Sequence, residues 1–185
     1  MLSIFLVVFQ LILSLSILFL SIGIIVYTID SSRADAPFVP VRKRALERII
    51  QALKLKSGSV VYDLGCGDAR VLIESINNTK DIRAIGVEKN FIIYLWTKWC
   101  TRNIPIKIRW GDVTNVPLKD ATHIYMYLFP KIMDKLLPKF QKECAIGTRI
   151  ISCDFVFSKL SPDEVIELPV VKDPLCKKLY VYVLK

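Results

Sequence analysis

Two glycines one residue apart, bordered by two acids, form the stretch of this chain with the clearest chemical potential. Gly65 and Gly67 follow the strand-forming residues 60–64, and Asp63 and Asp68 lie on either side of them. Glycine accepts positive φ and allows a ligand to lie against the backbone. A loop of this kind between a strand and a helix directs backbone N–H groups and the helix N-terminus towards one opening. The pattern therefore predicts a ligand site at the end of this strand.

The acids distinguish between two kinds of ligand. A dinucleotide fingerprint requires G-x-G-x-x-G, and Arg70 occupies the position of its third glycine. Asp63 and Asp68 would repel a pyrophosphate but attract an ammonium and a sulfonium. S-adenosylmethionine (SAM) carries both of these groups. We therefore predict a SAM site, the alternative being a strand-to-helix turn that uses glycine for steric reasons alone.

Two further acids follow predicted strands. The strand at 82–87 finishes on Glu88, about 20 residues beyond the glycine loop, which is the spacing of an acid that accepts hydrogen bonds from ribose hydroxyls. The strand at 106–110 leads to Asp112, which could accept the adenine amino group. The predicted cofactor-binding residues are Asp63, Leu64, Gly65, Cys66, Gly67, Asp68, Glu88, Lys89, Asp112 and Val113.

The elements that must position these residues alternate along the chain. Apolar periodicity predicts helices at 41–55, 69–76, 91–102 and 131–143, with strands from Val60 and at 82–87, 106–110, 123–128, 148–155, 164–171 and 179–184. This order predicts an α/β fold, a Rossmann-like seven-stranded, mostly parallel sheet whose terminal strand is antiparallel. The aromatic residues of the helix at 91–102 are interpreted as packing residues, the alternative being contacts with the substrate.

An apolar run, Leu2 to Ile29, precedes this domain and is long enough to cross a bilayer. A signal peptide is the alternative, since Ala34-Asp35-Ala36 imitates a cleavage site. However, no Lys or Arg precedes the run, and its length exceeds the roughly 7–15 apolar residues of a signal. We predict an uncleaved single-pass anchor at 1–30, a linker at 31–40 and a catalytic domain at 41–185. Because every Lys and Arg follows the run, the domain is predicted to be cytoplasmic or in an equivalent organelle matrix.

Composition limits the other function classes. A solvated, Lys-rich surface accounts for most of the net charge of +9, which also suits an anionic membrane surface. The scattered charges contain no nucleic-acid-reading motif, so no nucleic-acid partner is expected. The five cysteines show no C-x-x-C spacing and the chain has one histidine, so no metal site is expected. The sequence leaves the oligomeric state open.

Several motifs together resemble a narrower family. They are Pro37-Phe38-Val39-Pro40, the glycine loop, Gly86-Val87-Glu88, Tyr125-Met126-Tyr127-Leu128-Phe129-Pro130 and Gly147-Thr148-Arg149-Ile150-Ile151-Ser152. With the anchor they are similar to the small seven-strand SAM-dependent methyltransferases that modify lysines of the ATP synthase c-subunit and the adenine nucleotide translocase. Ala69 departs from the usual third glycine and should be tolerated if it is already helical, while Thr122 departs from a usual Asp.

The resemblance implies methyl transfer to a lysine of a membrane protein. The substrate channel is then expected to be lined by Phe38, Val39, Tyr125, Tyr127 and Phe129, with no general base identified. Two alternatives stay open: a methyltransferase of a lipid or small lipophilic molecule, and a SAM-binding membrane protein without turnover. The acids at the strand ends argue against the second alternative.

Overall fold

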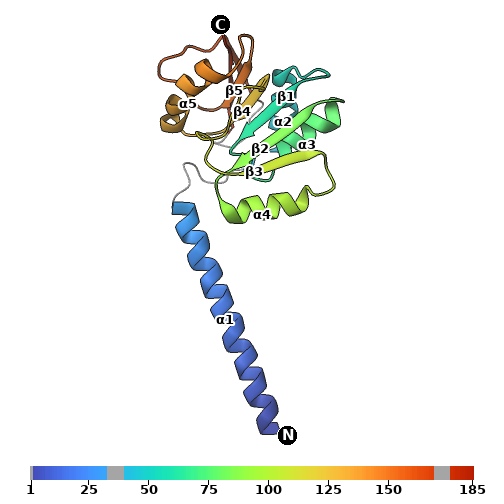
Figure 1. Ribbon diagram of the computed structural model, residues 1–185, viewed down its shortest axis with the longest axis vertical. Helices are drawn as coiled ribbons and strands as arrows, with labels where there is room; N and C mark the ends of the chain where they lie inside the picture. The colour runs from blue at the N-terminus through green and yellow to red at the C-terminus, as the bar shows by residue number, and fades with distance from the viewer. Residues whose placement is uncertain (1, 33–39, 169–175) are drawn as a thin grey trace. The chain divides into compact units, whose positions relative to one another are not determined.

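The computed structural model describes residues 2–32, 40–168 and 176–185, which fall into two compact units, Met1–Ala34 and Asp35–Lys185. The first unit is the helix α1, Leu2–Ser32 (Figure 1). Its stretch Ile4–Ile25 has 22 residues with a mean hydropathy of 2.6, so by length and composition it is able to cross a membrane. A signal sequence would pass the same test.

The second unit is built on one seven-stranded sheet with the order β3-β2-β1-β4-β5-β7-β6. The first five strands in that order are parallel, and β7 pairs antiparallel with both β5 and β6. This confirms the predicted Rossmann-like sheet with its antiparallel end. The strand bounds are β1 Val60–Leu64, β2 Arg83–Glu88, β3 Ile106–Trp110, β4 His123–Met126, β5 Arg149–Cys153, β6 Glu164–Glu167 and β7 Lys178–Val183.

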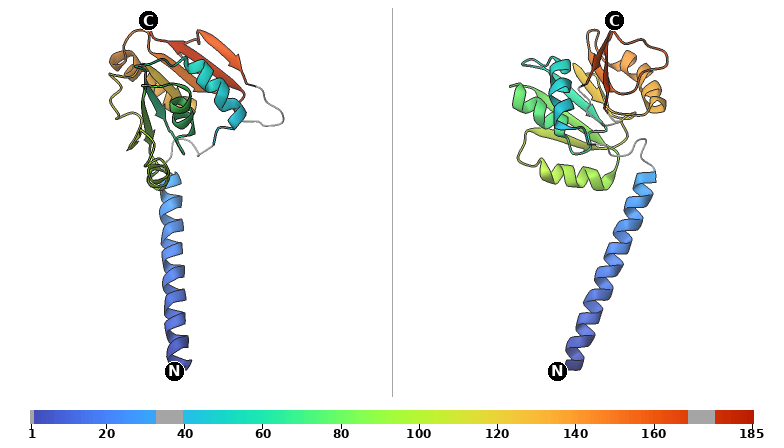
Figure 2. Two further views of the ribbon diagram at one scale, coloured as in Figure 1. Left: turned by 90° about the vertical axis from the view of Figure 1, so that its right-hand side faces the viewer. Right: turned by 180° about the vertical axis from the view of Figure 1, so that it is seen from behind.

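Four helices, α2 Lys43–Leu53, α3 Arg70–Asn78, α4 Phe91–Cys100 and α5 Pro130–Glu143, surround the sheet (Figure 2). The central strands are apolar on both faces, as parallel strands between helices must be. Val61 of β1 packs into one core with α2 and α3, whereas Tyr62 and Leu64 pack into a second core with α5. The β1 strand is therefore buried along its whole length, and its carboxyl end is fixed from both sides.

The start of α3 differs from the prediction. The helix begins at Arg70, and Ala69 precedes it with a φ of 60°, in the left-handed region. That conformation costs a residue with a Cβ roughly 1–2 kcal/mol, which is why glycine is preferred there. The expectation that Ala69 is tolerated because it is already helical is therefore wrong. It is fully buried among the residues that pack α3 on the sheet.

The outward face of α4 also contradicts the prediction. Trp96 and Trp99 were interpreted as packing residues, but their exposed fractions are 50% and 65%. The side of α4 that meets the domain instead carries buried Thr97, whose Oγ1 donates a hydrogen bond to the Gly67 carbonyl at 2.6 Å. The helix therefore meets the glycine loop through Thr97, and its two tryptophans face solvent.

Candidate active site

The glycine loop is fastened to the end of β2. Gly65 and Gly67 have φ values of 84° and 51°, which turn the chain sharply after β1. The backbone N–H groups of Gly65 and Cys66 both donate to the Val87 carbonyl, at 2.9 and 3.0 Å. The next donor in the loop, the Gly67 N–H, bonds the Glu88 carboxylate at 3.0 Å. The structure thus brings together the loop and the second-strand acid that the sequence predicted.

Close packing under the loop explains a glycine inside β2. A Cβ added to Gly86 would lie 2.7 Å from the Cys66 sulfur and 3.0 Å from Cδ1 of Ile108. The Cys66 side chain therefore fills the space that Gly86 leaves. Burial raises the pKa of the Cys66 thiol well above its usual value, with Asp63 and Glu88 adding to the rise, so it is a neutral packing group. Any contact of Cys66 with a ligand would have to come from its backbone.

Asp63 is the least satisfied charged group of the loop region. It is buried, and its carboxylate accepts no hydrogen bond from the described residues. Burial raises the pKa of Asp63 well above its usual value, and the nearby Asp68 and Glu88 raise it further. A buried carboxylate without donors is costly, so it favours either a proton or a cationic ligand. The ammonium group of SAM fits this requirement.

Glu88 is held by the backbone on two sides. One carboxylate oxygen accepts from the Gly67 N–H and the other from the Asn90 N–H at 2.8 Å. A carboxylate offers about four lone-pair sites, so it can also accept from ribose hydroxyls while keeping both bonds. Glu88 is buried beside the glycine loop, where we predict that it binds the ribose. That role remains a prediction.

Asp112 follows β3 and is already engaged by its neighbours. One oxygen accepts from the backbone N–H and hydroxyl of Thr114, at 2.9 and 2.7 Å, and the other pairs with Lys89 at 3.0 Å. Burial alone would raise the pKa of Asp112, but the Thr114 bonds and Lys89 outweigh it and hold the pKa below its usual value. Asp112 therefore stays ionised. Val113 beside it is buried in the core.

Asp68 has a local partner that the sequence reasoning did not identify. Both of its carboxylate oxygens accept hydrogen bonds from the Arg70 guanidinium, whose Nη1 also donates to the Val41 carbonyl. Asp68 consequently shares its charge with Arg70 instead of facing a ligand alone. Arg70 connects the glycine loop to the segment before α2, a link over 29 positions that no local pattern indicates.

Three aromatic rings gather beyond β4 and β5, at the same sheet edge as the loop. The ring centroids of Tyr127 and Phe129 lie 5.9 and 5.5 Å from the ring centroid of Phe155. Phe155 was not among the channel residues predicted from the sequence. The Tyr127 hydroxyl donates to Asp154 at 2.8 Å. Tyr125, in contrast, is 2% exposed, and its hydroxyl has no hydrogen-bond partner within the described ranges. The predicted channel residues Phe38 and Val39 lie outside the described residues.

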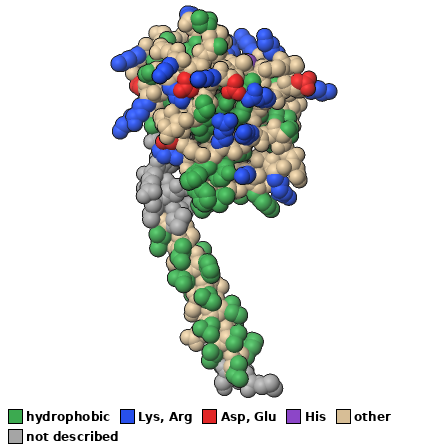
Figure 3. Space-filling view, viewed as in Figure 1, with side chains coloured by type: hydrophobic (Ala, Val, Ile, Leu, Met, Phe, Trp, Pro, Cys, Tyr) green, Lys and Arg blue, Asp and Glu red, His purple; other side chains and the backbone are tan. Residues whose placement is uncertain are grey.

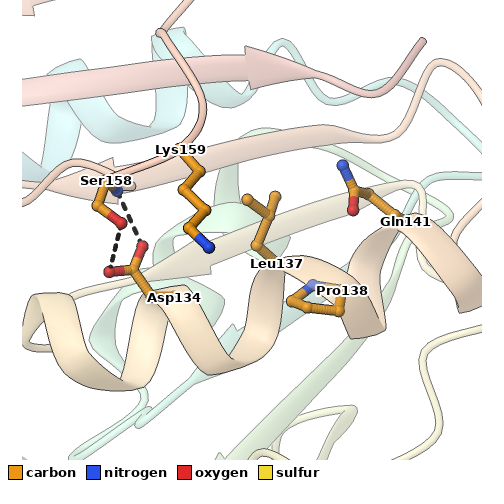
Figure 4. Close-up of a pocket in the computed structure, with 6 residues that line it drawn as sticks. All are labelled: Asp134, Leu137, Pro138, Gln141, Ser158 and Lys159. Carbon is orange, nitrogen blue, oxygen red and sulfur yellow. Dashed lines mark hydrogen bonds between the residues drawn. The ribbon is translucent and has the colours of Figure 1, made fainter.

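Two other features lie away from this edge. His123 is the first residue of β4, at the opposite end of the strand, and burial, helped by Arg149 and Lys56, lowers its pKa to about 4. A depression of about 380 Å³ lies along α5 (Figure 4). Its lining contains none of the predicted site residues, and Asp134 within it is bonded to Ser158.

Comparison with known proteins narrows the chemistry. Residues 63–164 match the family described as the ANTKMT methyltransferase domain. The chain is 30% identical over 138 residues to a protein-lysine N-methyltransferase of Saccharolobus islandicus, covering 71% of this chain and 84% of that protein. It is 28% identical over 137 residues to the human ATP synthase c-subunit lysine N-methyltransferase, covering 70% of this chain and 56% of that protein.

A solved structure supports the fold independently. An RNA methyltransferase from Salinibacter ruber, in complex with S-adenosyl-L-homocysteine, superposes with a TM-score of 0.71 at 24% identity. The alignment covers 79% of this chain and 94% of that one.

A mouse adenine nucleotide translocase lysine N-methyltransferase is 26% identical over 141 residues, which is 72% of this chain and 59% of that protein. The chain thus spans little more than half the length of these mammalian relatives.

Proposed function

Because the chain belongs to the ANTKMT methyltransferase domain family, we propose that it methylates the ε-amine of a lysine in a membrane protein. Membership confirms the resemblance seen in the sequence, and the chain is a SAM-dependent methyltransferase. The single structural observation behind the cofactor part of the proposal is the buried Asp63 carboxylate, which lacks a donor among the described residues beside the glycine loop. The relatives named for the ATP synthase c-subunit and the adenine nucleotide translocase support a membrane-protein acceptor.

The chain's own residues account for cofactor binding. When bound, SAM supplies a methyl group activated by its sulfonium. Asp63 would accept hydrogen bonds from its ammonium, Glu88 from its ribose hydroxyls and Asp112 from its adenine amine. The loop backbone between Gly65 and Gly67 would lie against it, because neither residue has a Cβ to keep it away.

Methyl transfer is an in-line displacement, so the protein must mainly align two reactants and exclude water. The acceptor amine has to be neutral to attack. Apolar surroundings and a nearby sulfonium both lower an amine's pKa, so no strong dedicated base is needed. The rings of Tyr127, Phe129 and Phe155 are the described groups best placed to supply this apolar wall.

The proposal includes membrane attachment through α1. Seven residues, 33–39, join α1 to the described part of the domain and reach at most roughly 25 Å. Lysines in loops and helix ends of membrane proteins lie within that distance of the bilayer. We propose that the domain faces the cytoplasm or an organelle matrix, because the basic residues follow α1.

Labelled SAM added to membranes that contain the full chain tests this proposal. The expected result is label in membrane protein, released as methylated lysine on hydrolysis. Label in the lipid phase would favour the lipid alternative, and no label would favour a binding protein without turnover. Asp63→Asn should lower labelling by roughly 10- to 150-fold at SAM concentrations below its Kd. Asp81→Asn, at an exposed turn before β2, is the matched control and should leave labelling unchanged.

A further inference from the structure

One helix of the domain presents an apolar stripe to solvent. Ile92, Leu95, Trp96 and Trp99 recur at the spacing of a single helical face, with exposed fractions from 39% to 65%. Trp110, at the end of the neighbouring edge strand β3, is 59% exposed. Figure 3 shows hydrophobic side chains gathered over α4 at this edge of the domain. We refer to these five residues as the α4 patch.

The charged residues on α4, on β3 and in the segment between them are all basic. Residues 91–111 contain Lys98, Arg102, Lys107 and Arg109 and no acidic residue. The Arg102 guanidinium lies 4.8 Å from the Trp99 ring centre, and Lys98 Nζ bonds the Tyr94 hydroxyl at 3.0 Å. Tryptophan beside lysine and arginine is the composition favoured at the boundary between lipid headgroups and acyl chains.

We propose that the α4 patch lies in the interfacial layer of an anionic bilayer, as a second membrane contact of the domain. This inference rests on the anchoring part of the proposed function, because α1 would keep the patch close to that surface. A second copy of the chain fits less well, since a two-fold contact would place each basic rim against its own copy. Anionic headgroups neutralise the same charges.

This contact would set the height of the active site. The helix α4 is capped by Asn90, whose side chain accepts from the Ile93 N–H and whose backbone N–H bonds Glu88. The patch and the cofactor acid are therefore joined by a rigid connection. With α4 in the interfacial layer, the mouth would open beside the headgroups, where loop lysines of membrane proteins lie.

The chain provides its own probe for this proposal. Its three tryptophans, Trp96, Trp99 and Trp110, all belong to the patch, and α1 has none. The full chain is reconstituted into phosphatidylcholine–phosphatidylglycerol vesicles with or without bromine on the upper acyl carbons. Flotation of the vesicles reports anchoring, and tryptophan emission reports the patch. Interfacial burial predicts that brominated lipid lowers emission by about half.

Two variants sharpen the result. Leu95→Glu combined with Trp99→Glu should remove most of the quenching of Trp96 and Trp110, while Ile146→Glu should leave it unchanged. Ile146 is the matched control because it is apolar and 83% exposed but lies outside the patch.

The outcomes distinguish the membrane anchor proposed for α1 from the membrane contact proposed for the α4 patch. A chain that does not float with the vesicles refutes both the anchor and the patch contact. A chain that floats but whose emission ignores bromine refutes the patch contact alone. Protection of that emission from aqueous acrylamide would then indicate a protein covering, and full quenching by acrylamide would indicate open solvent.

Discussion

Replacing Asp63 with asparagine should stabilise the cofactor-free domain and weaken SAM binding at the same time. The carboxylate is buried next to Asp68 and Glu88 and receives no hydrogen bond within the described residues. Asparagine keeps its shape and removes its charge. A residue whose replacement raises stability but weakens ligand binding is retained for the ligand, so the two effects together identify its purpose.

The stability gain has an upper limit. The raised pKa of Asp63 means that the folded chain can always take up a proton there instead of burying the charge. An unfolded-state carboxyl has a pKa of about 3.9, and protonating it costs about 1.36 kcal/mol for each pH unit above that value. At pH 7 this cost is about 4 kcal/mol, which is the most that asparagine can add to the unfolding free energy. Because the folded-state pKa is raised, the stability that Asp63 contributes is present at low pH and lost as pH rises. The advantage of asparagine should therefore vanish towards pH 4.

The binding loss follows from the contacts removed. A hydrogen bond between charged groups contributes about 1.5–3 kcal/mol, so SAM should bind roughly 10- to 150-fold more weakly. Urea unfolding of the full chain in detergent, followed by tryptophan emission from pH 4 to 8, measures stability, since every tryptophan lies in the second unit. Calorimetric titration with SAM measures affinity, and Asp81→Asn should change neither quantity. Unchanged SAM affinity, or a lower unfolding free energy at pH 7, would refute the reasoning.

Three further outcomes are expected. Gly86→Ala should lower the unfolding free energy by about 1–3 kcal/mol in urea titrations, because its methyl group would overlap the Cys66 sulfur; an unchanged midpoint would contradict this packing. Glu88→Ala should weaken SAM binding by at least about 10-fold in calorimetry, since it removes both a ribose acceptor and the partner of the Gly67 N–H. SAM affinity should fall as pH is lowered through the raised pKa of Asp63, with proton release on binding; equal heats in buffers of different ionisation enthalpy would exclude that release.

The sequence predicted the parts of this molecule that depend on local order. Alternating strands and helices gave the seven-stranded sheet, and parallel strands necessarily bring their carboxyl ends to one edge. Asp63, Glu88 and the glycine loop were therefore placed together correctly without any knowledge of distances. These features follow from covalent proximity and sheet topology, which a sequence pattern records directly.

The parts that were missed depend on contacts between distant segments. The spacing of apolar residues in α4 predicts an apolar stripe, but it does not tell whether that stripe faces the core or the solvent. The contact of Thr97 with Gly67 turns the other side of the helix towards the domain. The Arg70 link to Val41 and the φ of Ala69 likewise depend on how α3 meets the sheet. Tyr125 was expected in a channel wall, but neighbours from β5 and Cys176 enclose it.

The contact between Cys66 and Gly86 also restricts the order in which this sequence can change over evolutionary time. With cysteine at 66, a Cβ at residue 86 would lie 2.7 Å from the sulfur, so any enlargement there should destabilise the fold. Reducing residue 66 alone would leave Cδ1 of Ile108 3.0 Å from a Cβ at residue 86, so residues 66 and 108 both have to change before residue 86 can grow. Once residue 86 has grown, cysteine cannot return to position 66. Such a one-way dependence would keep the two positions coupled for as long as lineages of this fold diverge.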